Sequence, residues 1–214
     1  SSLAVSFFFV LSGFVLAYAY FNDRTFGLPF YKARFGRIWP TTMLSILLVF
    51  LILPRQAYLP QQLDQWMTGL VFLTNVLLLQ SLIPIPDFYF ALNAVVWSIS
   101  VECCFYLVFP ALNAFLRLHG YRALLLVALI GFLLTGLSLQ LSWPAFDPST
   151  LAQPSWHGTV YISPFTRLFE FAVGVLAGQL WVKTEFCRFR KKLTIYLQTE
   201  VRASLVSLVE MLLI

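Results

Sequence analysis

The chain has 214 residues, of which 60% are hydrophobic and only 11% are charged, and its mean hydropathy is +0.83. Soluble domains carry about 25% charged residues, so this composition excludes a water-soluble globular domain. The net charge of +5 is concentrated in a few short segments, which favours membrane topology over nucleic-acid binding as its explanation. Long apolar runs recur along the chain, and they predict an all-α polytopic transmembrane helical bundle.

The apolar runs indicate a single membrane domain over residues 1–214. A bilayer-spanning helix needs about 20 apolar residues, and the expected segments are 3–21, 38–53, 66–83, 97–116, 123–142 and 165–182, with another starting after 203. The chain opens on an apolar run without Met and ends inside another, so we expect both ends to continue into a longer protein. The spacing of Cys103, Cys104 and Cys187 fits neither a disulfide framework nor a metal site, and no metal is predicted.

The first segment, 3–21, is uncharged and contains Ser12 next to Gly13. Small residues in a membrane helix usually permit close contact with a neighbouring helix. From the residues alone, packing is therefore the favoured interpretation of this pair.

Residues 22–40 form a polar, basic connection in which Gly27 and Pro29 mark a turn. Arg34 and Arg37 are three residues apart, so they share one helix face. Two guanidiniums held in this way suit a phosphate or a diphosphate. The alternative is that the connection is basic only because it faces the cytoplasm.

Basic connections are expected on the cytoplasmic side of the membrane, and they are 22–37, 117–122 and 183–192. The Pro- and Trp-rich connection 143–164 then lies outside. As a consequence, the helix that begins at Trp97 must start from the outer side.

That start is possible only if one of the two preceding segments, 38–53 or 66–83, fails to cross the membrane. Segment 66–83 carries the polar residues Asn75 and Gln80, and we expect it to be re-entrant or a partial span. Irregular backbone at membrane depth is tolerated where it is buried in protein or lines a cavity.

The helix from Trp97 carries a carboxylate, Glu102, within an otherwise apolar run. An acid near the bilayer centre costs about 3 kcal/mol or more, and it almost always faces a protein interior or a wet cavity. Helical spacing places Ser98 on the face of Glu102 and Tyr106 one turn further along. The residues leave two roles open for Glu102, a functional acid or a structural acid neutralised by a neighbouring arginine.

Arg167 and Glu170 begin the last complete segment as an i,i+3 pair on one face, and the spacing of Gly174 and Gly178 is typical of close helix packing. We expect this surface to contact the helix that carries Glu102 and to pair Glu102 with Arg167. The alternative is an interfacial arginine that extends to lipid headgroups.

Four stretches of the chain resemble motifs of the acyltransferase 3 family, membrane O-acyltransferases that modify polysaccharides, lipopolysaccharide, peptidoglycan and some small molecules. They are FFVLSGF at 8–14, RFGRIWP at 34–40, WSISVE at 97–102 and RLFEFAVG at 167–174. The resemblance covers nearly the whole chain but only the middle portion of the family's domain, so it implies an incomplete acyltransferase 3 domain.

The resemblance implies that an acyl group, most simply acetyl, moves from acetyl-CoA or another acyl-CoA to a hydroxyl of a saccharide or cell-envelope glycan. The expected location is a bacterial inner membrane, with the lipid bilayer and the hydroxyl-bearing acceptor as partners, no nucleic acid, and no indication of oligomeric state. The implied site residues are Glu102, Arg167 and Glu170 for catalysis, Arg34 and Arg37 for donor binding, and Ser12, Trp97 and Ser98 for the substrate.

Acyl transfer to a hydroxyl needs a general base, and the resemblance implies a histidine in a helix upstream of this chain. We assign no catalytic role to His119, in a cytoplasmic turn, or to His157, in the outer connection. Two other functions stay open. One is a transporter or flippase subunit for a lipid-linked or small substrate, which would use Glu102 and Arg167 as a gated ion pair. The other is an inactive membrane scaffold.

Overall fold

The computed structural model describes residues 2–21, 26–54, 58–59, 64–144 and 153–184, and within them the regular structure is helical, with no strand. The predicted all-α bundle is confirmed. The helices long and apolar enough to cross a membrane are α2 (Leu28–Ile52), α5 (Trp97–His119), α6 (Tyr121–Gln140) and the stretch Gly158–Lys183. That stretch joins a π-helical turn, η4 (Gly158–Ile162), to α7 (Pro164–Lys183), and α1 (Ser2–Ala19) is a shorter apolar helix.

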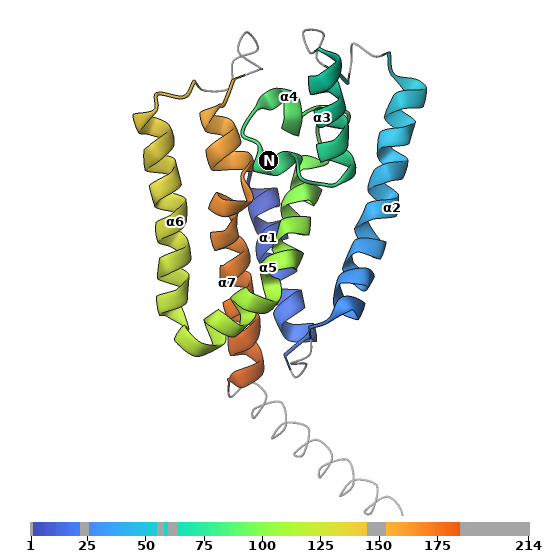
Figure 1. Ribbon diagram of the computed structural model, residues 1–214. Helices are drawn as coiled ribbons and strands as arrows, with labels where there is room; N and C mark the ends of the chain where they lie inside the picture. The colour runs from blue at the N-terminus through green and yellow to red at the C-terminus, as the bar shows by residue number, and fades with distance from the viewer. Residues whose placement is uncertain (1, 22–25, 55–57, 60–63, 145–152, 185–214) are drawn as a thin grey trace, which may run out of the picture.

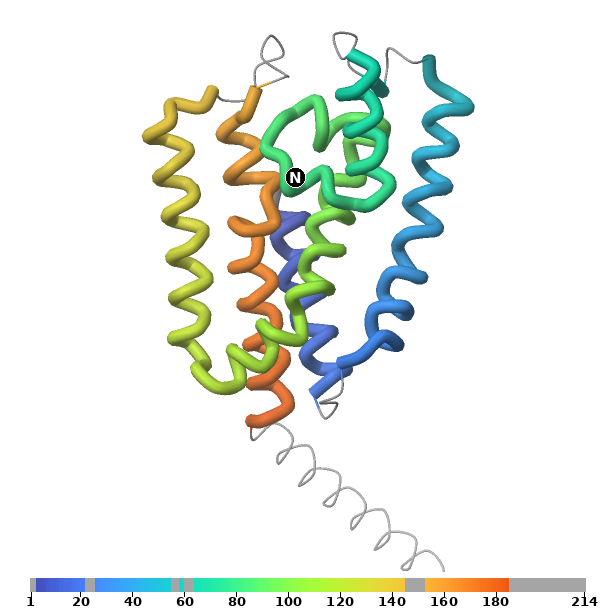
Figure 2. Tube along the Cα trace, in the orientation of Figure 1, coloured from blue at the N-terminus to red at the C-terminus, as the bar shows by residue number. Residues whose placement is uncertain are grey.

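The centre of the bundle is formed by α1, α5 and α7, with α6 beside α7 and α2 on the opposite side (Figures 1 and 2). One end of the bundle contains the end of α1, the start of α2, the α5–α6 turn and the end of α7 (Figure 1). The basic residues Arg117, Arg122 and Lys183 belong to these helix ends. We call this end the basic end and the other the opposite end.

The structure corrects the predicted start of the second helix. α2 begins at Leu28, with Pro29 in its first turn, rather than at residue 38. Proline suits a first turn because the N–H that it lacks would have no partner within the helix. Arg34 and Arg37 therefore lie on a helix and not in a loop.

The region predicted to be re-entrant folds as short helices. α3 (Gln65–Val76) has 12 residues, which makes it about 18 Å long and too short for a hydrocarbon core of about 30 Å. The chain then turns back through η2 (Gln80–Leu82) and α4 (Pro86–Tyr89). α3 and α4 lie in the same half of the bundle, where α5 starts at Trp97 (Figure 1).

Side-chain hydrogen bonds hold the turn after α3 against α5. Leu78 has a φ of 57°, in the left-handed region that a non-glycine residue rarely occupies. The hydroxyl of Ser100 donates to the Leu78 carbonyl oxygen over 2.7 Å, and the Ser81 and Ser100 hydroxyl oxygens are 2.7 Å apart. The amide of Asn75 donates to the carbonyl oxygens of Val71 and Phe88. These bonds satisfy irregular backbone without water, as membrane depth requires.

Three glycines allow α1 and α7 to pack with their backbones in contact. A Cβ added at Gly178 would lie 2.7 Å from the carbonyl oxygen of Phe14, and one at Gly174 would be closer still to that of Val10. Gly13 on α1 faces α7 in the same way. The prediction that Gly174 and Gly178 approach α5 is therefore wrong, because the helix they approach is α1.

Aromatic rings fill the space between α5 and α7. Phe105 stacks on Phe171 with ring centroids 4.6 Å apart, and Phe105 also meets Phe9 of α1 edge to face at 5.2 Å. All three rings are buried. The stacked rings of Phe105 and Phe171 take up more space between α5 and α7 than the glycines take up between α1 and α7. As a result, α7 lies further from α5 than from α1.

Candidate functional site

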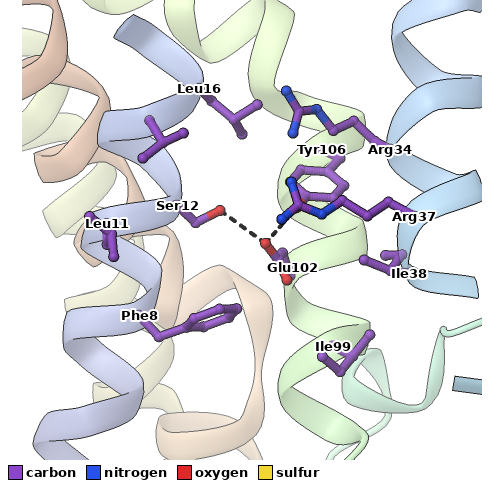
Figure 3. Close-up of a pocket in the computed structure, with 11 residues that line it drawn as sticks. Phe8, Leu11, Ser12, Leu16, Arg34, Arg37, Ile38, Ile99, Glu102 and Tyr106 are labelled. Atoms are coloured by element: carbon purple, nitrogen blue, oxygen red, sulfur yellow. Dashed lines mark hydrogen bonds between the residues drawn. The ribbon is translucent and has the colours of Figure 1, made fainter. Parts of the chain in front are cut away.

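A cavity of about 310 Å³ lies between α1, α2 and α5 (Figure 3). Most of its wall is apolar, and the polar groups that reach it converge from all three helices. Its lining residues are Phe8, Leu11, Ser12, Val15, Leu16, Arg34, Arg37, Ile38, Ile99, Glu102 and Tyr106. A largely apolar cavity with a few convergent polar groups is the usual form of a small-molecule site.

Glu102 is the carboxylate in this cavity, and it is only 7% exposed. The hydroxyl of Tyr106, one turn along α5, donates to its Oε1 over 2.5 Å. The hydroxyl of Ser12 on α1 donates to the same oxygen over 3.1 Å (Figure 3). Hydrogen bonds to a carboxylate are among the stronger ones, so this side chain is held in one orientation. Both donors bind the same carboxylate oxygen, Oε1.

Two guanidiniums reach the cavity from successive turns of α2. Arg34 lies against the rings of Tyr20, Phe30 and Tyr106, with its Cζ 5.3 to 5.9 Å from their centroids, a cation–π arrangement. Its Nε is buried without a hydrogen-bond partner among the described residues. Arg37 points toward Glu102 (Figure 3). The cavity thus contains two cations beside one carboxylate.

A second polar cluster joins α7 to α1. Arg167, which is 8% exposed, donates from Nη1 to Glu170 Oε1 over 2.6 Å and from Nε to the Tyr161 carbonyl oxygen over 2.8 Å. Its guanidinium also lies 4.4 Å from the Tyr161 ring centroid. The Ser6 hydroxyl donates to Glu170 Oε1 over 2.9 Å. Within the described part of the chain this is the only ion pair.

The predicted pairing of Glu102 with Arg167 is wrong. Glu102 binds Ser12 and Tyr106, whereas Arg167 binds Glu170 on its own helix. The reason is the close contact of α1 with α7, which brings Ser6 of α1 to the Arg167 pair. Ser12, six residues further along α1, points to α5 instead. One helix therefore supplies a hydroxyl to each of two separate clusters.

The remaining predicted site residues lie outside the cavity lining. The ring of Trp97 packs 5.3 Å from that of Tyr161, near Arg167. The Ser98 hydroxyl donates to the Val95 carbonyl oxygen over 3.2 Å, at the start of its own helix. Of the three residues expected at the substrate, the structure places only Ser12 in the cavity.

Three residues of these clusters were not among the predicted site residues. Tyr106 had a signal in the sequence, since it lies one helical turn from Glu102. Ser6 had none, because its contact with Glu170 joins segments far apart in the chain. Tyr161 lies only six residues before Arg167, but the two are separated by the break between η4 and α7, across which helical spacing predicts no shared face.

His157 lies beside the second cluster and not in the cavity. Its ring stacks on Tyr161 with centroids 4.9 Å apart. Burial lowers the pKa of His157 below its ordinary value, and the charge of Arg167 lowers it further. His119 lies against Phe115 at the end of α5. Among the residues described, no three His, Cys, Asp or Glu side chains form a group that could hold a metal.

The chain is an integral membrane protein built around a cavity that combines cations with a buried carboxylate. Residues 1–198 match the family model described as an acyltransferase domain, and the chain belongs to the acyltransferase 3 family. It is similar to Acyltransferase MdmB of Streptomyces mycarofaciens, with 38% identity over 109 residues, which are 51% of this chain and 27% of the relative. The matched segment thus spans about a quarter of that relative's length. No solved structure matches the chain.

Proposed function

We propose that the cavity transfers an acyl group, most simply acetyl, from acyl-CoA to a hydroxyl of a saccharide or cell-envelope glycan. The observation that carries this proposal is the presence of two guanidiniums and one buried carboxylate in a single cavity. The guanidiniums can bind the phosphate groups of CoA through charge-assisted hydrogen bonds. The carboxylate can accept a hydrogen bond from the hydroxyl of the acceptor. Arg167 and Glu170 have a structural role in this proposal, because Glu170 accepts a hydrogen bond from Ser6 and so joins α7 to α1.

The charge distribution supports a cytoplasmic donor. The positive-inside rule places the basic end of the bundle in the cytoplasm, where CoA thioesters are made. Arg34 precedes Arg37 on α2, which starts at this end, so a donor that enters from the cytoplasm meets Arg34 first. We place the protein in a bacterial inner membrane, with the Streptomyces relative in support.

Glu102 positions the acceptor in this proposal. Its Oε2, which receives no hydrogen bond from the described residues, accepts one from the acceptor hydroxyl and directs the hydroxyl oxygen at the thioester carbonyl carbon. The new carbon–oxygen bond forms, the carbon–sulfur bond breaks, and the hydroxyl proton ends on the departing CoA thiol. Arg37 points toward Glu102 (Figure 3), so in this proposal the donor that it holds lies beside the acceptor hydroxyl.

The positions of Glu102 and Arg167 argue against the transporter alternative. It depended on a gated ion pair between Glu102 and Arg167, and these residues belong to separate clusters. A transporter also gives no reason for Arg34 and Arg37 to bind an acyl donor.

Acetyl-CoA binding by the detergent-purified chain, measured by calorimetry, tests the donor site. Arg34→Ala and Arg37→Ala should each weaken binding about 10- to 100-fold, as expected for a lost charge-assisted hydrogen bond of about 1.5–3 kcal/mol. Lys32→Ala is the matched control, because it removes a cation from α2 that lies outside the cavity lining. If both arginine variants bind acetyl-CoA as tightly as the Lys32→Ala control, Arg34 and Arg37 do not form the donor site.

Glu102→Gln separates donor binding, measured in detergent, from acyl transfer, measured in membranes. It should leave acetyl-CoA affinity within a few-fold of wild type, while thiol release in membranes that contain the acceptor falls about 100-fold or more. A full rate in this variant would contradict the role proposed for the carboxylate.

A further inference from the structure

Toward the opposite end the cavity lining has only apolar side chains, whereas toward the basic end it mixes Arg34 and Tyr106 with Val15 and Leu16. On α1, Phe8 lies one turn before Ser12, and on α5, Ile99 lies about one turn before Glu102, a step of about 4.5–6 Å along the axis. Both helices run toward the basic end (Figure 1). Phe8 and Ile99 are therefore both displaced from the polar residues in the same direction, toward the opposite end. Figure 3 shows them together, beyond Ser12 and Glu102.

The third helix follows the same order. α2 runs away from the basic end (Figure 1), and Ile38 comes one turn after Arg34. Figure 3 shows its side chain level with Glu102, between Arg37 and Ile99. We call the side chains of Phe8, Ile38 and Ile99 the apolar end of the cavity.

The apolar end is backed by the turn that follows α3. Ile38 and Ile99 pack against a buried cluster of Leu78, Val96 and Cys103. Leu78 is fully buried, and its carbonyl oxygen accepts the hydrogen bond of Ser100 described above. A fixed, close-packed wall of this kind limits the length of whatever occupies the cavity.

We propose that the apolar end holds the acyl chain of the donor and that Ile99 and Phe8 set the chain length accepted. This inference rests on the proposed function. A donor that enters from the basic end presents its phosphates to Arg34 and its thioester to Glu102, so the acyl carbons extend next into the apolar end. An alkyl chain is the part of acyl-CoA that gains most from this surface, since each buried methylene is removed from water. The ligand class of the subsite is therefore a short saturated acyl chain.

Binding of a series of CoA thioesters to the full chain in detergent tests this subsite. The probes are CoA itself, acetyl-CoA, butyryl-CoA and hexanoyl-CoA. Ile99→Ala and Phe8→Ala each lengthen the apolar end and should raise the ratio of hexanoyl-CoA to acetyl-CoA affinity about tenfold or more, since one methylene in a fitted pocket changes selectivity by about 10- to 200-fold.

The matched control is Val15→Ala, which removes side-chain carbons from the same cavity on the basic side of Ser12. It should leave the chain-length ratio unchanged. Thermal unfolding of each variant shows that it is folded, and affinity for CoA without an acyl group corrects for general damage.

The outcomes separate the subsite from the proposed function. If wild type binds the probes and both Ile99→Ala and Phe8→Ala keep the wild-type ratio of hexanoyl-CoA to acetyl-CoA affinity, the acyl subsite is wrong and the donor site is unaffected. If the ratio changes equally in Val15→Ala, the subsite is also wrong. If wild type binds neither CoA nor any thioester, the donor-site assignment and the acyl-subsite assignment are both wrong.

Discussion

The contact of α1 with α7 at Gly174, the tightest at any glycine in the described part of the chain, offers a sharp test of the packing argument. Gly174→Ala adds a methyl group to α7 where α1 leaves no room for it. The atom it would meet is the backbone carbonyl oxygen of Val10, and a backbone atom cannot turn away as the end of a side chain can. Either the two helices separate or the added methyl stays strained.

The magnitude follows from two opposing terms. Overpacking of a close contact costs typically about 1–3 kcal/mol, and a separation of α1 from α7 would also loosen Ser6 from Glu170. Alanine is favoured over glycine in a helix by about 1 kcal/mol. At Gly136 on α6, a Cβ would meet nothing within 4 Å among the described residues, so Gly136→Ala keeps only the favourable term. The free energies of unfolding of the two variants should therefore differ by about 1–3 kcal/mol.

Thermal unfolding in a single detergent measures this difference. For a chain of this size, 1 kcal/mol corresponds to about 2–4 °C in the melting temperature. Gly174→Ala should melt several degrees below Gly136→Ala, and acetyl-CoA affinity should fall with it because α1 carries Ser12 into the cavity. Equal melting temperatures would refute the close contact of α1 and α7.

Two further predictions concern the second cluster. Glu170→Ala should lower the free energy of unfolding by about 3 kcal/mol, because it leaves the buried Arg167 guanidinium without its partner. Arg167→Ala should lower it by less, because the Glu170 side chain that it leaves is 22% exposed. In the double variant the loss should be smaller than the sum, and additive losses in a double-mutant cycle would argue against the pair. His157 has a pKa below 6.5 in the folded protein, so the unfolded state binds the proton more tightly and stability should fall as pH is lowered below 6.5. His157→Gln should reduce that slope in thermal unfolding, and an unchanged slope would contradict the argument.

Much of the fold and part of the site depend only on residues close together in the chain. Apolar runs of about 20 residues and the scarcity of charge were enough for a helical membrane bundle. The three-residue spacing of Arg34 and Arg37, and the four-residue spacing of Glu102 and Tyr106, determined which side chains share a helix face. The sequence also contained the motifs by which the family was recognised.

The tertiary structure alone decided which helix faces meet. The spacing of Gly174 and Gly178 indicated a close neighbour without saying which helix it was, and the choice of α1 over α5 separated Arg167 from Glu102. Ser6 binds Glu170 for the same reason, because α1 packs against α7.

The turn after α3 shows the same division. Asn75 and Gln80 hinted at irregular backbone, but no local rule predicts that a leucine, Leu78, adopts a positive φ. It does so where Ser100, 22 residues away, binds its carbonyl oxygen. Helical periodicity follows from backbone geometry within a few residues. The partner of a side chain, by contrast, depends on how closely segments far apart in the sequence can pack, and backbone contacts and aromatic rings decide that only when the whole bundle is assembled.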